Sequence, residues 1–298
     1  NYSYFGDEDE AHMVYQFVLP PLLLDAFWNE DSTYINKWLQ NFYIPKSNNT
    51  FLNFTASHDG IGVSPAKTLL PQSRIDTLVN ETLKRGGRVS YKYDASSHDL
   101  KSPYELNITY FSALADLNHD VHLSCKRFLS SQAFMLGLQG IPAIYFNSLF
   151  GVKNDQKLFD ITNQNRSLNR TKFDYHCLSS LIHNTHTIEH LIFEAFKKII
   201  KQRICFDIFD PAASQTYLEL GSAAIAGLIR TNSLNNKLIM ITNFSKSKYV
   251  VNLSPYCSKI IKNLLDDDFW YDYDEENKSL DIKSFILTPY QTCWLIVE

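Results

Sequence analysis

The pattern of apolar and polar residues changes character near residue 213. Before this point, short apolar runs alternate with longer segments whose apolar positions recur at helical spacing, as is typical of a β/α fold. After it, short apolar runs follow one another closely and are separated by turn residues, which predicts antiparallel strands. The sequence therefore predicts an α/β domain over residues 1–212 and a small antiparallel β domain over 213–298.

In the first part, short apolar runs predict strands at residues 13–17, 50–56 and 141–146. Pro20 and Pro21 suit the first turn of a helix whose buried face covers residues 22–28. Residues 128–138 are apolar on nearly every side, and residues 187–203 carry one apolar stripe, so both segments predict helices. Residues 65–118 show poor periodicity and are too long for an ordinary connection, which predicts a long loop insertion.

In the second part, the turn pair Asn235-Asn236 separates two of the apolar runs. These runs are the predicted strands of the β domain, at residues 223–230, 238–244, 250–253, 285–287 and 292–297.

Composition narrows the classes of protein. With 298 residues, of which 45% are hydrophobic, the chain can bury a sizeable core. A net charge of −4 and the lack of a basic tract argue against a nucleic-acid partner. No apolar run approaches the roughly 18 residues of a membrane span, so we expect no membrane partner.

Cysteine and acidic residues do not predict a metal site. The five cysteines are dispersed and lack Cys-x-x-Cys spacing, so we expect reduced structural thiols and a cytoplasmic location. The acidic residues between Asp266 and Glu276 lack the spacing of a calcium loop and are expected to form a solvated surface. No metal and no cofactor is therefore expected.

The candidate chemistry is concentrated where the second predicted strand ends in His58-Asp59, followed by Gly60 and Gly62. These glycines release the backbone into a loop. At the C-terminal end of a barrel strand, a carboxylate in this position faces substrate. Alternatively, the pair forms a buried hydrogen bond or caps a turn.

Several blocks resemble the sucrose-phosphorylase-like branch of glycoside hydrolase family 13, in order and approximate spacing. Two of them read Phe-Thr-Ala-Ser-His-Asp-Gly-Ile-Gly and Gly-Ile-Pro-Ala-Ile-Tyr-Phe. The blocks are residues 3–7, 10–17, 19–24, 54–62, 86–92, 102–107, 140–146 and 165–170.

The resemblance implies an α/β fold: the C-terminal part of a (β/α)₈ barrel, about its sixth to eighth units, followed by a small antiparallel β domain. Family members carry a nucleophilic Asp and an acid/base Glu in earlier motifs that are not found here. The resemblance therefore implies the C-terminal portion of an enzyme, with the N-terminal half of the barrel as a possible partner. Unpaired strand edges would make this portion poorly soluble or oligomeric.

Site residues follow from the same resemblance. It implies that Asp59 stabilises the transition state and that His58 donates to a glucose hydroxyl. Asn169 and Arg170 are implied at the nonreducing end of the glucose, with a surface Arg in a polar loop as the alternative. Tyr104 and Glu105 match a segment on the acceptor side, or are ordinary loop residues.

The activity implied is that of an α-glucoside phosphorylase, which transfers glucose with retention between inorganic phosphate and an acceptor such as fructose or glycerate. Sucrose, sucrose 6-phosphate, glucosylglycerol and glucosylglycerate remain open as substrates. Asn147, where relatives often have His, and Val63-Ser64 depart from the pattern and bear on this choice. The alternatives are an amylase-type hydrolase or transglucosidase, and a non-catalytic split-gene subunit or remnant.

Overall fold

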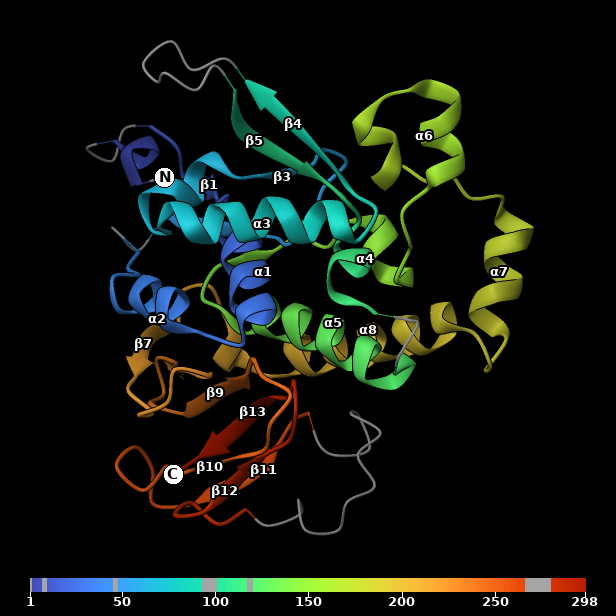
Figure 1. Cartoon of the computed structure of the whole chain (residues 1–298). Coiled ribbons are helices and arrows are strands. Elements are labelled where there is room, and N and C mark those ends of the chain that lie inside the picture. The colour runs from blue at the N-terminus through green and yellow to red at the C-terminus, as the bar shows by residue number, and fades with distance from the viewer. Residues whose placement is uncertain (1, 7–9, 45–47, 93–100, 117–119, 266–279) are drawn as a thin grey trace.

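The computed structural model describes residues 2–6, 10–44, 48–92, 101–116, 120–265 and 280–298 (Figure 1). The acidic segment noted above, residues 266–276, lies outside these residues. The helices are α1 Leu19–Asn29, α2 Thr33–Gln40, α3 Gln72–Lys84, α4 Tyr110–Leu114, α5 Val121–Gly137, α6 Gln156–Thr162, α7 Tyr175–His183 and α8 Ile188–Cys205. The strands are β1 Met13–Tyr15, β2 Thr50–Asn53, β3 Ile61–Gly62, β4 Arg88–Lys92, β5 Ser102–Asn107, β6 Ile141–Pro142, β7 Ser214–Leu218, β8 Ile225–Thr231, β9 Lys237–Asn243, β10 Tyr249–Val251, β11 Ile260–Asn263, β12 Phe285–Leu287 and β13 Thr292–Val297.

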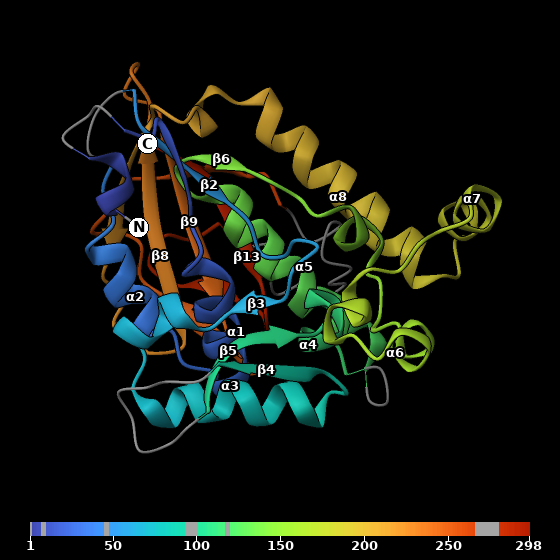
Figure 2. The same ribbon diagram turned by 90° about the horizontal axis from the view of Figure 1, so that it is seen from above.

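The first part of the chain is built on a parallel sheet with strand order β1-β2-β6. Val14 pairs with Phe51 and Leu52 pairs with Ile141, so the three strands run in register with their carboxyl ends at one edge. Figure 2 shows β2 and β6 side by side, with α5 and α8 next to them. This arrangement confirms the expected α/β fold with part of a barrel.

The two faces of this sheet differ in exposure. Val14 and Phe51 are buried against the helices. Met13 and Tyr15, on the other face of β1, are 46% and 54% exposed, and Phe17 just beyond the strand is 49% exposed. Parallel sheets are normally covered on both faces, so this apolar face is unusual for a folded β/α protein.

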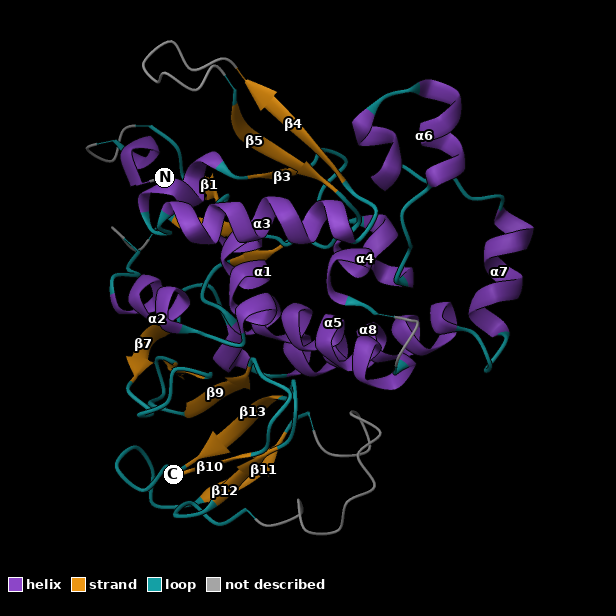
Figure 3. Ribbon diagram, in the orientation of Figure 1, coloured by secondary structure: helices purple, strands orange, loops and turns teal. Residues whose placement is uncertain are grey.

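The insertion at residues 65–118 is more ordered than the sequence suggested. It contains α3, α4 and the strands β4 and β5, which form an antiparallel sheet of order β3-β5-β4 with the preceding strand β3, in place of an irregular loop (Figure 3). The helix α3 buries only Ile75, Leu78 and Thr82 against its surroundings. A stripe this narrow among many polar residues gives little periodicity, which explains why the helix was not predicted.

The predicted strands of the first part are longer than those observed. The third predicted strand, residues 141–146, contains β6 over only two residues and is followed by the 3₁₀ helix Phe146–Phe150. Gly140 precedes this stretch, and Pro142 within it cannot donate a ladder hydrogen bond. Both long helices are confirmed, as α5 and α8.

The C-terminal part forms a five-stranded antiparallel sheet with order β11-β13-β9-β8-β7, beside a two-stranded pair β10-β12. The antiparallel β region is therefore confirmed, although β7 and β11 were not predicted from the sequence. Both strands lie at the edges of the sheet, and residues 214–218 alternate between exposed and partly buried positions with polar side chains.

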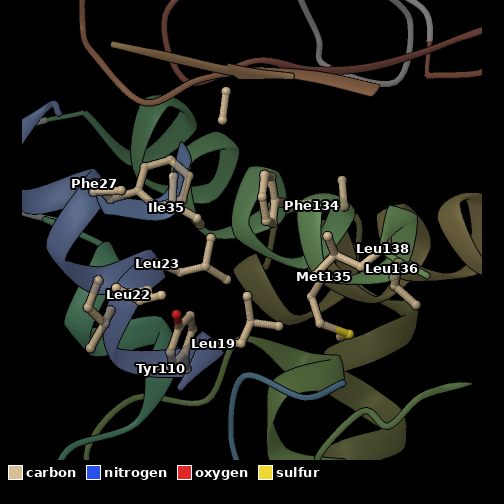
Figure 4. Close-up of a cluster of buried hydrophobic side chains, with 14 of the residues drawn as sticks. Leu19, Leu22, Leu23, Phe27, Ile35, Tyr110, Phe134, Met135, Leu136 and Leu138 are labelled. Atoms are coloured by element: carbon tan, nitrogen blue, oxygen red, sulfur yellow. The ribbon is translucent and has the colours of Figure 1, made fainter. Parts of the chain in front are cut away.

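One core joins the helices to the five-stranded sheet (Figure 4). Phe27 of α1 and Phe134 of α5 both pack on Phe244, with ring centroids 4.7 and 5.8 Å apart. A second apolar cluster occupies the opposite face of the sheet and includes Leu253 and Leu287. The five-stranded sheet therefore lies between two cores.

A buried arginine reinforces this junction. Arg230 on β8 is fully buried and donates to the carbonyl oxygens of Gly137, Asp210, Ala213 and Ser214 at 2.8–3.2 Å. Burial, together with the neighbouring Arg203, lowers the pKa of Arg230 to about 9. The guanidinium thus links the C-terminal end of α5 to the start of the β region.

No helix in the described part of the chain is long and apolar enough to cross a membrane. Within the same residues, no group of three or more His, Cys, Asp or Glu side chains is placed to hold a metal ion.

Candidate active site

His58 and Asp59 lie in the loop that follows β2, at the carboxyl edge of the parallel sheet. The strand ends at Asn53, earlier than the sequence suggested, and residues 54–60 form the connection to β3. The side chains of His58 and Asp59 are 71% and 41% exposed. The pair is therefore open to solvent, and its ring and carboxylate are separated by 3.7 Å from Nε2 to Oδ1.

Two arginines face the Asp59 carboxylate. Arg166 Nη1 lies 2.6 Å from Asp59 Oδ1, and Arg170 Nη2 lies 3.4 Å from the same oxygen. Both arginines come from the end of the segment after β6, in and just beyond the 3₁₀ helix Asn165–Asn169. The structure therefore brings Arg170 to Asp59 and adds Arg166, which the sequence did not single out. The predicted contact of Arg170 with glucose stays a prediction.

Asn169 and Arg170 also hold the backbone of the loop. The Asn169 side-chain amide donates to the carbonyl oxygens of Ser57 and Asp59 at 3.3 and 2.8 Å. Arg170 Nε donates to the carbonyl oxygen of His58 at 2.7 Å. Asn169 is 4% exposed, so in this structure its amide positions the loop. A contact between Asn169 and substrate stays a prediction.

Glu105 on β5 is buried, with only 5% of the residue exposed. Its Oε1 accepts from the Gly60 backbone N–H at 3.1 Å and from Arg166 Nη2 at 2.8 Å, and its Oε2 accepts from Arg166 Nε at 3.3 Å. A hydrogen bond to Glu105 and attraction to Glu105 and Asp59 raise the pKa of Arg166. Both Glu105 oxygens are therefore bound by protein groups, and its contact with substrate stays a prediction.

Gly60 is required by this close approach of β5. A Cβ atom at residue 60 would lie 2.5 Å from Glu105 Cγ and 2.8 Å from the Leu106 carbonyl oxygen. Neighbouring Tyr104 is half-buried, and its carbonyl oxygen accepts from the Val63 N–H at 2.8 Å. The strand that carries Tyr104 and Glu105 is thus fixed directly to the His58-Asp59 loop.

A small cavity of about 10 Å³ lies beneath the loop, lined in part by Asp59, Tyr145, Asn147 and Asn169. This volume is close to that of one water probe. Tyr145 donates its hydroxyl to the Asn169 carbonyl oxygen at 2.9 Å, and burial raises the pKa of Tyr145 while Arg170 opposes the rise. Asn147 donates to the carbonyl oxygens of Asn169 and Thr171, at 3.4 and 3.3 Å. Asn147 therefore supports the arginine-bearing segment from below.

Sequence comparison finds known enzymes that are similar to this chain. The chain is 39% identical over 245 residues to the glucosylglycerate phosphorylase of Spirochaeta thermophila, covering 82% of this chain and 41% of that enzyme. It is 33% identical over 296 residues to the glucosylglycerate phosphorylase of Escherichia coli, covering 99% of this chain and 50% of that enzyme. The chain belongs to the sucrose-phosphorylase-like branch of glycoside hydrolase family 13. It spans about half the length of these relatives.

Structural comparison shows the fold of the chain and no more. The sucrose 6F-phosphate phosphorylase of Thermoanaerobacter thermosaccharolyticum superposes with a TM-score of 0.67 at 20% identity, over 84% of this chain and 47% of that structure. The α-amylase of H. orenii superposes with a TM-score of 0.59 at 12% identity, over 100% of this chain and 51% of that structure, and shows the fold alone. No family model matches the chain.

Proposed function

We propose that this chain is the sugar-positioning part of an α-glucoside phosphorylase, which transfers glucose between inorganic phosphate and an acceptor. The observation that carries the proposal is the Asp59 carboxylate, held by Arg166 and Arg170 at the carboxyl edge of a parallel sheet. Homology to glucosylglycerate and sucrose phosphorylases supports the reaction class.

In this proposal Asp59 acts on the charge that develops during transfer. Retaining glycoside chemistry passes through an oxocarbenium-like transition state, in which positive charge builds on the sugar ring. A fixed carboxylate stabilises that charge most effectively in a site where its orientation is set in advance. The His58 side chain lies beside it and is 71% exposed, so it can donate a hydrogen bond to a sugar hydroxyl.

Retaining transfer needs two further carboxyl groups, a nucleophile and an acid/base, about 5–5.5 Å apart. The carboxylate that shares Arg166 with Asp59 is Glu105, and both of its oxygens are already bound by Arg166 and the Gly60 amide. Glu105 is therefore a poor candidate for either role. We infer that the nucleophile and the acid/base come from polypeptide that this chain does not contain.

The uncovered face of the parallel sheet supports the same inference. Tyr15, Phe17 and Phe54 form an aromatic cluster with ring centroids 5.4–5.9 Å apart, and Tyr15 and Phe17 remain about half exposed. A parallel sheet is covered on both faces in β/α folds. We propose that further β/α units, the N-terminal half of the barrel, cover this face and complete the active site.

Glucosylglycerate is the substrate we favour. Glucosylglycerate phosphorylases from three organisms match at 33–39% identity, whereas sucrose phosphorylases match at 28–33% and a glucosylglycerol phosphorylase matches at 27%. The phosphate and acceptor would bind beside Tyr104. We also propose the division at residues 1–212 and 213–298, and a cytoplasmic location, which the five free thiols support.

The test is phosphorolysis of glucosylglycerate and of sucrose, which is measured as the release of glucose 1-phosphate. The chain is assayed alone and mixed with the part of the Escherichia coli relative that it does not match. We expect activity only in the mixture. Asp59→Asn should lower kcat on the order of 10²–10³-fold, while Asp76→Asn, an exposed carboxylate on α3, should not.

Other outcomes assign other functions. Release of free glucose independent of phosphate would indicate a hydrolase or transglucosidase. Activity of the chain alone would contradict our inference that its catalytic carboxyl groups lie elsewhere. If neither the chain alone nor the mixture is active, and the two parts of the mixture are shown to associate, the chain would be a non-catalytic subunit.

A further inference from the structure

Arg166 occupies a position between two carboxylates that come from different parts of the chain. Its Nε and Nη2 atoms donate to Glu105 Oε2 and Oε1, and its Nη1 atom lies 2.6 Å from Asp59 Oδ1. Glu105 lies on β5 of the antiparallel sheet, whereas Asp59 follows β2 of the parallel sheet. One guanidinium therefore joins the two sheets at the candidate active site.

The contacts to Asp59 are asymmetric. Arg166, Arg170 and the His58 ring all approach the same oxygen, Oδ1. Within the described part of the chain, no hydrogen bond from a protein group to Asp59 Oδ2 is found. The carboxylate is thus held on one side, and its second oxygen is left to accept hydrogen bonds from a ligand.

The arrangement depends on the shape of the guanidinium group. A planar fork can give two parallel hydrogen bonds to one carboxylate and still present a third nitrogen to another acceptor. A lysine ammonium keeps the charge but cannot hold both carboxylates in one plane. Arg170 cannot replace Arg166, because its Nε is used by the His58 carbonyl oxygen and its Nη2 lies farther from Asp59, at 3.4 Å.

We propose that Arg166 is a positioning residue for the transfer reaction: it fixes the Asp59 carboxylate so that Oδ2 receives the sugar, and it couples Asp59 to the acceptor-side strand β5. This inference rests on the function proposed above for Asp59. Arg166 acts through Asp59 and Glu105. Because Glu105 also accepts from the Gly60 N–H, movement of β5 is transmitted to the loop that carries Asp59.

A direct role for Arg166 as a phosphate ligand is the competing explanation, since its side chain is 41% exposed. However, three of its five N–H groups already face Glu105 or Asp59. Phosphate could use only the two N–H groups that remain, whereas the positioning role uses contacts that the structure already shows.

The first test is amide hydrogen exchange on this chain, which needs no activity. Arg166→Gln and Arg166→Lys are compared with Arg88→Gln. Arg88 lies on β4 of the same sheet, with its guanidinium over the Phe159 ring, and contacts neither carboxylate. We expect the Asp59 and Gly60 amides to exchange about tenfold faster or more in both Arg166 variants, and to be unchanged in Arg88→Gln. Unchanged exchange in the Arg166 variants, at equal thermal unfolding midpoints, would overturn the proposal.

The second test uses the complemented enzyme and separates positioning from phosphate binding. Loss of orientation should lower kcat on the order of 10²-fold, leave KM for phosphate unchanged, and be only partly restored by Arg166→Lys. A raised phosphate KM at unchanged kcat would instead make Arg166 a phosphate ligand. If the wild-type mixture is inactive, the proposed function fails, and the exchange experiment still decides whether Arg166 orders the Asp59 loop.

Discussion

Replacing Asp25 with asparagine should remove a pH dependence from the stability of this protein. Asp25 lies on α1 with its side chain 1% exposed. Its Oδ1 accepts from Asn29 at 2.9 Å and from Arg74 at 3.4 Å. Burial raises the pKa of Asp25 to about 7, and the nearby charge of Asp31 adds to the rise while Arg74 opposes it.

The magnitude follows from the difference between folded and unfolded states. A pKa raised from its ordinary 3.8 to about 7 corresponds to about 4 kcal/mol, at about 1.4 kcal/mol for each pH unit. Because the folded pKa is the higher one, the folded state binds the proton more tightly. The contribution of Asp25 to stability is therefore fully present below the unfolded pKa and is lost as the pH rises to about 7.

The assay is urea unfolding of wild type and Asp25→Asn from about pH 5 to pH 8. The asparagine amide does not ionise. The unfolding free energy of the variant, relative to wild type, should therefore rise by about 1.4 kcal/mol for each pH unit up to about pH 7 and stay constant above it. A difference in unfolding free energy that stays constant with pH would refute the reasoning. A difference that decreases as the pH rises would mean that the pKa of Asp25 is lowered in the folded state.

Asp31→Asn is the matched control, because Asp31 shares Arg74 with Asp25. Burial would raise the pKa of Asp31, but hydrogen bonds from Thr33 and the charge of Arg74 outweigh it, and the pKa is lowered. Asp31 therefore contributes stability above its unfolded pKa that is lost as the pH falls. The variant should be less stable than wild type at neutral pH and approach it in acid.

Three further changes test other parts of the structure. Gly60→Ala places a methyl group against Glu105 and Leu106, so it should cost about 1–3 kcal/mol in urea unfolding; a neutral result would mean that β5 moves away freely. Arg230→Met removes the donor to four carbonyl oxygens, of which that of Asp210 still accepts from the Ala213 N–H, and should cost about 3 kcal/mol or more; a loss below about 1 kcal/mol would show that water replaces the guanidinium. Replacing Tyr15 and Phe17 with serine should reduce self-association in sedimentation velocity, and unchanged association would place the contact elsewhere.

The parts of the fold predicted from sequence are those with strong local patterns. The stripe of α8 and the apolar run of α5 each determine a helix without reference to the rest of the chain. The short strand before His58-Asp59 was likewise visible, because apolar residues end at glycines. The helix α3 and the edge strand β7 were missed because few of their residues are buried.

The candidate site was predicted only in part, for a different reason. Asp59 and Arg170 have roles implied by the family resemblance, whereas Arg166, in the same block as Arg170, resembles a solvated charge until Glu105, 61 residues away, is placed against it. The resemblance singled out Glu105 for the acceptor side, but its burial and its contacts with Gly60 and Arg166 depend on the folded structure. Ion pairs across such separations leave no periodic signal.

The five-stranded sheet between the two cores has a consequence for how the chain unfolds. Phe244 directly follows β9 of the β region but packs on α1 and α5. Arg230 donates to the Gly137 carbonyl oxygen at the last turn of α5. Opening the β region would strip apolar cover from the helices that support β2 and β6. The two regions are therefore expected to unfold in one calorimetric transition. The β region acts as a structural wall of the half-barrel. Deleting the chain from residue 213 onward would therefore disrupt the half-barrel as well.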